Sequence, residues 1–212
     1  MKRFFAVCIS CALVFVFWMI LFKKPGVPDV SEIQRNKRLP SKYLISFGNP
    51  EAPIKIIEYF SFACPHCLTL FRTDFKPIRE NFIEKDLVFW TFHPVPMDVV
   101  TVQAMDCLEK LSDERKRIIL EAYLEEAEAG DPEICTLILM EAMKVFGNPL
   151  PRLGDNEHLE STQAFSDAFN FVKENPSMNA VPSLEVNGLI HDGNVPGVNF
   201  VREIVLKNRG NL

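Results

Sequence analysis

The chain has 212 residues, a formal net charge of −5 and 48% hydrophobic residues, among them 18 phenylalanines. This length and composition fit one folded domain, or one domain with an insertion, around a sizeable buried core. The sequence has no basic patch and no basic segment interleaved with aromatic residues, so we do not expect nucleic acid as a partner.

An unbroken apolar segment covers residues 4–22, between Lys2-Arg3 and Lys23-Lys24. It is long enough to cross a bilayer core, which takes about 20 residues of helix. It exceeds the roughly 7–15 residues of a signal-peptide core, and no convincing small-residue cleavage site follows it. We therefore expect residues 1–24 to form an uncleaved signal anchor, with a cleaved signal peptide as the alternative. Either one would export the rest of the chain to an oxidising compartment.

Residues 25–42 are polar, charged and proline-bearing, without helical or strand periodicity. We expect this segment to be a tether. It is too short to form a folded domain of its own.

The segment 43–96 carries a strand–helix–strand pattern after a short first strand at 43–47. Residues 54–61 predict a buried strand and residues 87–92 the next one. The helix between them begins at Pro65 and has one apolar face, formed by Leu68, Phe71, Phe75, Ile78 and Phe82. A right-handed crossover would make the two strands parallel.

The pattern is helical throughout residues 97–176. Four apolar stripes recur at helical spacing: Val100, Ala104, Cys107, Leu108 and Leu111; Leu120, Tyr123, Leu124 and Ala127; Cys135, Ile138, Leu139, Ala142 and Phe146; Phe165, Ala168, Phe169 and Val172. The third helix should begin with Asp131 as its N-cap and end at Gly147-Asn148-Pro149. These residues predict a helical subdomain.

The final segment, 177–212, returns to strands. Residues 183–186 and 189–191 predict two strands joined by Asn187-Gly188, the preferred dipeptide of a two-residue hairpin turn. A last helix is expected over 200–207, with Val201, Ile204 and Val205 facing inward.

Two cysteines, Cys64 and Cys67, lie where the buried strand passes into the helix. A pair with this spacing can exchange between dithiol and disulfide, close an inert structural disulfide or supply half of a zinc site. Unpaired N–H groups at a helix N-terminus stabilise a thiolate, the form that exchanges with disulfides. The position therefore favours redox chemistry over an inert disulfide.

Zinc is disfavoured because it needs four ligands. Apart from Cys8 and Cys11 in the predicted leader, no second pair has ligand spacing. His93, His158 and His191 are scattered, and we interpret them as structural or solvent-exposed.

These residues carry a family resemblance. The sequence FSFACPHC, with Glu58 six positions before the first cysteine, resembles the DsbA branch of the thioredoxin-like oxidoreductases, and so does the lead-in GNPEAP at 48–53. A further match is AVPS at 180–183, which resembles the family's cis-proline loop. The resemblance covers about residues 43 to 208. It implies an α/β thioredoxin-like fold, with halves at 43–96 and 177–212 and a helical insertion at 97–176.

The motif residues have separate expected roles. Cys64 would be the nucleophile and Cys67, one helical turn further, the buried resolving thiol. Pro65 suits the first helical position, where its missing N–H costs nothing. The resemblance supports a role for His66 in stabilising the Cys64 thiolate, and the alternative is an exposed polar residue of the first turn.

Glu58 shares a strand face with Ile56 and Phe60 and should point into apolar surroundings. Its raised pKa would let it accept the proton of Cys67. The alternative is an edge-strand glutamate that faces water.

The resemblance implies a cis bond between Val181 and Pro182. This bond would turn the backbone of Val181 toward Cys64 and offer hydrogen bonds to an extended client peptide.

Cys107 and Cys135 lie on apolar helical stripes. They are either buried free cysteines or partners in a structural disulfide, Cys107–Cys135.

The resulting hypothesis is an exported thiol-disulfide oxidoreductase that introduces disulfides into cysteine-containing client proteins and needs no cofactor or metal. We expect a monomer, because the tether cannot form the dimerisation domain of the related isomerases. Val181 lacks a hydroxyl and matches oxidase-like members. The family implies a membrane redox partner, which for an oxidase would be quinone-linked, and a periplasmic or extracytoplasmic location, tethered to the inner membrane by residues 4–22.

Alternatives remain. The same motif could serve a reductase or isomerase, and a non-catalytic peptide binder of the same fold is a further possibility. A metal-delivery protein would need a CxxxC and an additional histidine ligand, and the sequence has neither.

Overall fold

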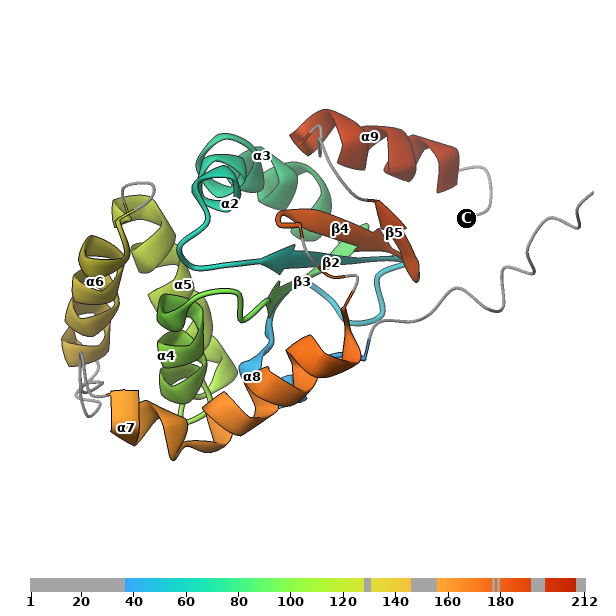
Figure 1. Cartoon of the computed structure of the whole chain (residues 1–212). Coiled ribbons are helices and arrows are strands. Elements are labelled where there is room, and N and C mark those ends of the chain that lie inside the picture. The colour runs from blue at the N-terminus through green and yellow to red at the C-terminus, as the bar shows by residue number, and fades with distance from the viewer. Residues whose placement is uncertain are drawn as a thin grey trace, which may run out of the picture. The chain divides into compact units, whose positions relative to one another are not determined.

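The computed structural model (Figure 1) describes residues 37–127, 131–145, 156–176, 178, 180–191 and 197–208. All of them belong to one compact unit, Asn36–Leu212. The predicted signal anchor or signal peptide lies outside the described residues. Within the described part of the chain, no helix is long and apolar enough to cross a membrane.

A five-stranded sheet has the order β1-β3-β2-β4-β5. Its strands are β1 (Ile45–Phe47), β2 (Ile54–Phe60), β3 (Val88–Pro94), β4 (Ser183–Val186) and β5 (Leu189–His191). The central pair, β2 and β3, is parallel, as predicted, and the other pairs are antiparallel. The motif follows the middle strand of this sheet.

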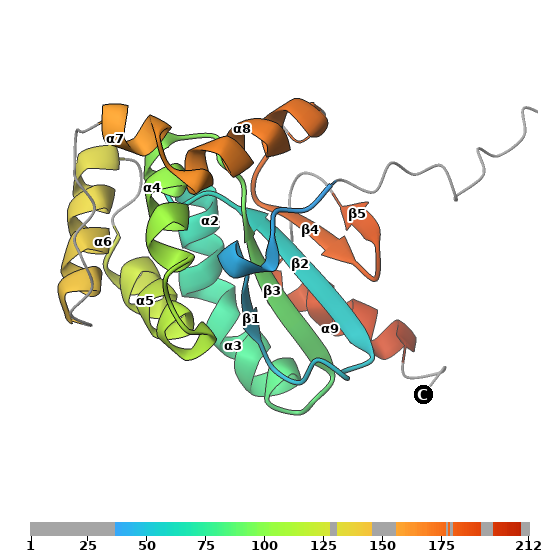
Figure 2. The ribbon, with the colours of Figure 1, turned by 90° about the horizontal axis from the view of Figure 1, so that it is seen from below.

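Side chains of β2 alternate between two separate parts of the core. Ile54, Ile56 and Phe60 belong to one buried cluster, and Ile57 and Tyr59 belong to another. Helices α2, α3 and α9 lie on one side of the sheet and α8 on the other (Figures 1 and 2). Glu58 follows the alternation and faces the first cluster.

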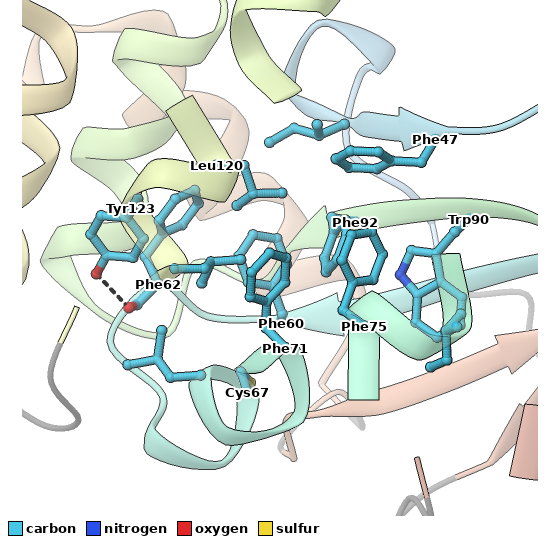
Figure 3. Packing of buried hydrophobic residues seen from close by; sticks show 14 of the residues in the cluster. Phe47, Phe60, Phe62, Cys67, Phe71, Phe75, Trp90, Phe92, Leu120 and Tyr123 are labelled. Atoms are coloured by element: carbon cyan, nitrogen blue, oxygen red, sulfur yellow. Dashed lines mark hydrogen bonds between the residues drawn. The ribbon is translucent and has the colours of Figure 1, made fainter. Parts of the chain in front are cut away.

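The first cluster is rich in aromatic rings (Figure 3). Phe75 and Phe92 make an edge-to-face contact at 5.1 Å, and Phe71 stacks on Phe75 at 4.9 Å. Such pairs stabilise a core beyond their buried area. This packing fixes the first helix against the sheet below the motif.

The first helix is continuous but irregular. It comprises α2 (Pro65–Leu70), a π-helical stretch η3 (Phe71–Phe75), α3 (Lys76–Ile78) and a second π-helical stretch η4 (Arg79–Ile83). Pro77 lies in α3, between the two widened stretches. The wider π turns accommodate a residue that lacks an N–H.

The helical segment contains α4 (Val99–Leu108), α5 (Asp113–Glu126), α6 (Pro132–Val145), α7 (Asn156–Glu160) and α8 (Gln163–Glu174). The four predicted helices are confirmed, α7 was not predicted, and the predicted stop at 147–149 lies outside the described residues. The predicted face of α8 is partly wrong. Phe169 is 63% and Val172 51% exposed, whereas Ala164, Ala168 and Phe171 are buried.

The C-terminal part agrees with the sequence pattern. Asn187 and Gly188 have φ values of 48° and 90°, which the hairpin turn between β4 and β5 requires. Helix α9 (Gly197–Asn208) buries Val201 and Val205, as predicted.

The tether predicted over 25–42 needs a correction at its C-terminal end, because residues 37–42 are part of the domain. Leu39 is buried, and its N–H donates to Nε2 of His93 at 3.0 Å. Arg38 pairs with Glu185 of β4, and Lys37 with Glu174 of α8 at 2.7 Å. These polar contacts join residues far apart in sequence, which no local pattern reveals.

Candidate active site

Cys64 is the N-cap residue of α2, as the motif's position predicts, and Pro65 occupies the first turn. The sulfur of Cys64 accepts a hydrogen bond from the backbone N–H of Cys67 at 3.3 Å. Cys64 is half-buried, and Cys67 is 2% exposed. The sequence therefore places one accessible and one buried sulfur at the same helix N-terminus.

The pKa of Cys64 is lowered to about 6 by the hydrogen bond from the Cys67 thiol, the backbone N–H groups of Cys67 and His66, and the charge of His66, while burial opposes the shift. The His66 side chain is exposed. His66 is thus an exposed residue of the first turn whose charge also lowers the pKa of Cys64. The interpretation as an exposed polar residue and the role in stabilising the thiolate are therefore compatible. A thiol with this pKa is largely thiolate at neutral pH.

Cys67 has the opposite electrostatics. Burial raises its pKa far above the ordinary value, and the hydrogen bond to Cys64 and the charge of Glu58 raise it further. Its thiol therefore needs a base before it can attack another sulfur.

Glu58 is 2% exposed and lies on the same side of the sheet as the motif. Burial raises its pKa to about 8, the N–H of Trp90 lowers it, and the charge of Cys64 raises it. The indole Nε1 of Trp90 donates to Oε2 of Glu58 at 3.3 Å. A buried carboxyl with a pKa near neutrality suits proton exchange with Cys67.

The loop before β4 approaches the motif from the opposite direction. The Val181–Pro182 bond is cis, and the carbonyl oxygen of Val181 lies 3.6 Å from the sulfur of Cys64, which donates to it when protonated. The structure therefore brings the two separate sequence matches together.

Three residues of the helical segment, Asp98, Thr101 and Tyr123, hold the loop before Cys64 through hydrogen bonds. The sequence did not indicate this role. Tyr123 donates through its hydroxyl to the Phe62 carbonyl at 2.6 Å (Figure 3), and the N–H of Phe62 donates to Oγ1 of Thr101 at 3.0 Å. Ser61 donates to Asp98 at 2.6 Å. The backbone N–H and C=O groups of a buried loop need hydrogen-bond partners. The sequence does not indicate which distant side chains supply them.

Cys107 and Cys135 are both buried, and both are free thiols in this structure, as are Cys64 and Cys67. Burial raises the pKa of Cys107 to about 12. The pairing of Cys107 with Cys135 stays a prediction. In the described part of the chain, no group of three or more His, Cys, Asp or Glu side chains could hold a metal ion.

A family model described as Thioredoxin matches residues 41–202. A search of curated proteins found no match.

Several solved structures have the same fold. BdbD from Bacillus subtilis is 20% identical with a TM-score of 0.63, covering 81% of this chain and 96% of its own. Wolbachia pipientis alpha-DsbA1 is 20% identical with a TM-score of 0.61, covering 82% and 94%. The catalytic domain of Proteus mirabilis ScsC is 16% identical with a TM-score of 0.56, covering 81% and 91%. The chain belongs to the thioredoxin family and has the fold of DsbA-type thiol-disulfide oxidoreductases.

Proposed function

We propose that this protein is an exported thiol-disulfide oxidase that introduces disulfides into folding proteins. The observation that carries the proposal is the asymmetry of the two motif sulfurs. Cys64 is accessible and its pKa is lowered to about 6, whereas Cys67 is buried and its pKa is raised. A stabilised thiolate is a good leaving group, so release of Cys64 from a mixed disulfide is favoured.

The proposed reaction starts from the Cys64–Cys67 disulfide. A client thiolate attacks Sγ of Cys64, the S–S bond breaks, and Cys67 leaves as a thiolate that takes a proton from Glu58. The second client thiolate then attacks the client sulfur of the mixed disulfide, and Cys64 leaves as a thiolate. The client loses two electrons to the motif, which ends as the dithiol.

A client peptide would bind across the loop of Val181. The carbonyl of Val181 lies beside Cys64, where an extended chain could add main-chain hydrogen bonds. A cavity of about 290 Å³ supports binding of apolar client side chains. It is lined by Pro96, Met97, Asp98, Val99, Val102, Leu159, Glu160 and Phe165. The bond from Ser61 to Asp98 links this cavity to the loop of the motif.

Two further parts of the proposal concern the surroundings. We propose that residues 4–22 tether the protein to the inner membrane on its periplasmic side, and that a membrane redox partner, quinone-linked for an oxidase, re-oxidises the dithiol. We also propose that the protein acts as a monomer.

The competing function is a reductase or isomerase that uses the same motif in the other direction. It is favoured by the likeness to the protein-disulfide isomerase from Novosphingobium aromaticivorans, which is 14% identical with a TM-score of 0.54. Val181, which brings no hydroxyl to the sulfurs, favours the oxidase.

The test uses a reduced, unfolded client protein that contains one cysteine pair. The loss of the client's free thiols measures its oxidation. The disulfide form should oxidise this client, and Cys64→Ala and Cys67→Ala should each abolish the reaction, because neither variant can form the motif disulfide. Cys107→Ala, a buried cysteine outside the motif, is the matched control and should retain activity. A protein that reduces insulin disulfides but does not oxidise the client would be a reductase.

A further inference from the structure

We propose that Trp90 is a positioning residue that holds the Glu58 carboxyl group in place and favours its charged form, so that Glu58 can accept the proton of Cys67. This inference rests on the proposed roles of Cys64, Cys67 and Glu58. It adds Trp90, a residue of β3 outside the motif.

The geometry of the sheet brings the two side chains together. Trp90 pairs with Ile56 in the parallel register, and Glu58 lies two residues further along β2. Residues two apart on a strand point to the same face, so the indole and the carboxyl share the buried side of the sheet. Their contact is the 3.3 Å hydrogen bond from Nε1 to Oε2.

An indole N–H can only donate a hydrogen bond. It therefore stabilises the carboxylate more than the carboxylic acid, and in this site it opposes the effect of burial on the pKa of Glu58. It also fixes Oε2, which leaves the other oxygen of Glu58 for proton exchange.

Few other groups act on this carboxyl. The titratable groups that influence it are the thiols of Cys64 and Cys67, both from the motif. Its partners across the sheet are apolar: Phe92 on β3 and Leu184 on β4. Trp90 is therefore the neutral donor that counteracts desolvation of Glu58.

The indole is also held firmly. Trp90 is 1% exposed and lies beside Phe75 and Phe92 in the aromatic cluster (Figure 3), with ring centroids 6.2 Å away in both cases. Both rings pack against the indole from the cluster side, and this packing holds its N–H in one direction. Substitution of Trp90 by Phe keeps an aromatic ring and removes the donor.

The affected step is the attack of Cys67 on a mixed disulfide at Cys64. The S–H bond of Cys67 breaks and its proton passes to Glu58. The Cys67 sulfur then bonds to Cys64, and the partner thiolate leaves. The reduced protein, mixed with a chromogenic aromatic disulfide, should release two thiolates in sequence, the first through Cys64 and the second through Cys67. Stopped-flow absorbance separates the two phases.

Trp90→Phe should move the pH midpoint of the second phase upward by about one unit, because a hydrogen bond to a charged group favours that form about tenfold. The first phase should keep its midpoint. Phe82→Leu, which removes a buried ring from the same cluster but neither a ring that holds Trp90 nor a bond to Glu58, should shift neither midpoint. In a Glu58→Gln background, Trp90→Phe should have no further effect on the pH profile.

A second measurement uses the native indole. The chain has two tryptophans, so Trp18→Phe leaves Trp90 as the only one. Its fluorescence in the reduced protein should titrate with a midpoint near 8, and this step should vanish when Glu58→Gln is added.

The proposal is overturned if the second-phase midpoint does not move in Trp90→Phe, if it moves equally in the Glu58→Gln background, or if the fluorescence has no step that depends on Glu58. Failure of the proposed function gives a different result, in which the first phase shows no low midpoint and does not require Cys64.

Discussion

The backbone N–H of Cys67 donates a hydrogen bond to the sulfur of Cys64, 3.3 Å away. This bond exists because Cys64 is the N-cap of α2, where the first N–H groups have no partner within the helix. It stabilises negative charge on the Cys64 sulfur, whereas Cys67 is buried in the core. The chemistry expected of the motif follows from this difference.

Alkylation should separate the two motif cysteines. At mildly acidic pH, iodoacetamide should modify Cys64 alone, with a rate that rises with pH around a midpoint near 6. Cys67 should react slowly because it is buried and its pKa is raised. Mass spectrometry of the alkylated peptides measures both rates. Equal rates, or a Cys64 midpoint at the ordinary thiol value, would remove the nucleophile assignment.

The pH dependence of stability should report the buried Glu58. Its pKa is about 8 in the folded dithiol protein and 4.5 ordinarily. Between these values the unfolded chain has lost the proton that the folded protein retains, so this group lowers the free energy of unfolding as pH rises from 4.5 to 8.

Glu58→Gln should remove this pH-dependent decrease in the free energy of unfolding. The reduced variant should therefore gain stability relative to the native protein across this window, by about 5 kcal/mol. Urea unfolding at several pH values measures the difference. The stabilising contribution of the Cys64 thiolate, which grows from pH 6 to 9, is common to both proteins. A difference that stays constant with pH would mean that Glu58 does not bind its proton more tightly in the folded state.

Tyr123 should contribute to stability through the loop before the motif. Tyr123→Phe leaves the buried carbonyl of Phe62 without its donor, which should cost about 1–3 kcal/mol in chemical denaturation. The matched control is Thr69→Val, which removes an exposed hydroxyl that bonds within its own helix and should change stability by less than about 0.5 kcal/mol. Equal effects of the two variants would show that the Tyr123 hydroxyl does not support the loop.

The cavity lined by Met97 and Val102 should affect clients and not small thiols. Met97→Asp places a charge at its exposed rim and should raise the KM for an unfolded protein client, because desolvating a charge opposes binding of apolar side chains. The rate with a small thiol should not change. Leu137→Asp, at an equally exposed apolar position on α6, is the control. If both variants raise the KM alike, the cavity is not the client site.

The sequence predicted those features that depend on local signals. The order of strands and helices follows from apolar periodicity, and the Cys64–Cys67 pair follows from its place between a strand and a helix. The approach of Val181 to Cys64 came from the family resemblance, because the two loops are far apart in the chain.

Contacts that depend on register or tertiary packing could not be predicted. The bond between Trp90 and Glu58 requires the pairing of β2 with β3. The exposure of Phe169 requires knowledge of which side of α8 meets the sheet. The docking of Arg38 on Glu185 is made by charged side chains, which the sequence suggested would be solvated.

The reduction potential of the Cys64–Cys67 couple tests the oxidase proposal most directly, and equilibration with glutathione buffers measures it. Stabilisation of the Cys64 thiolate favours the dithiol, so the potential should be less negative than the value of about −270 mV for thioredoxin and lie toward the value of about −120 mV for DsbA. The dithiol form should also resist denaturant better than the disulfide form. A potential at or below that of thioredoxin, with the disulfide form the more stable, would contradict the proposal and identify a reductase.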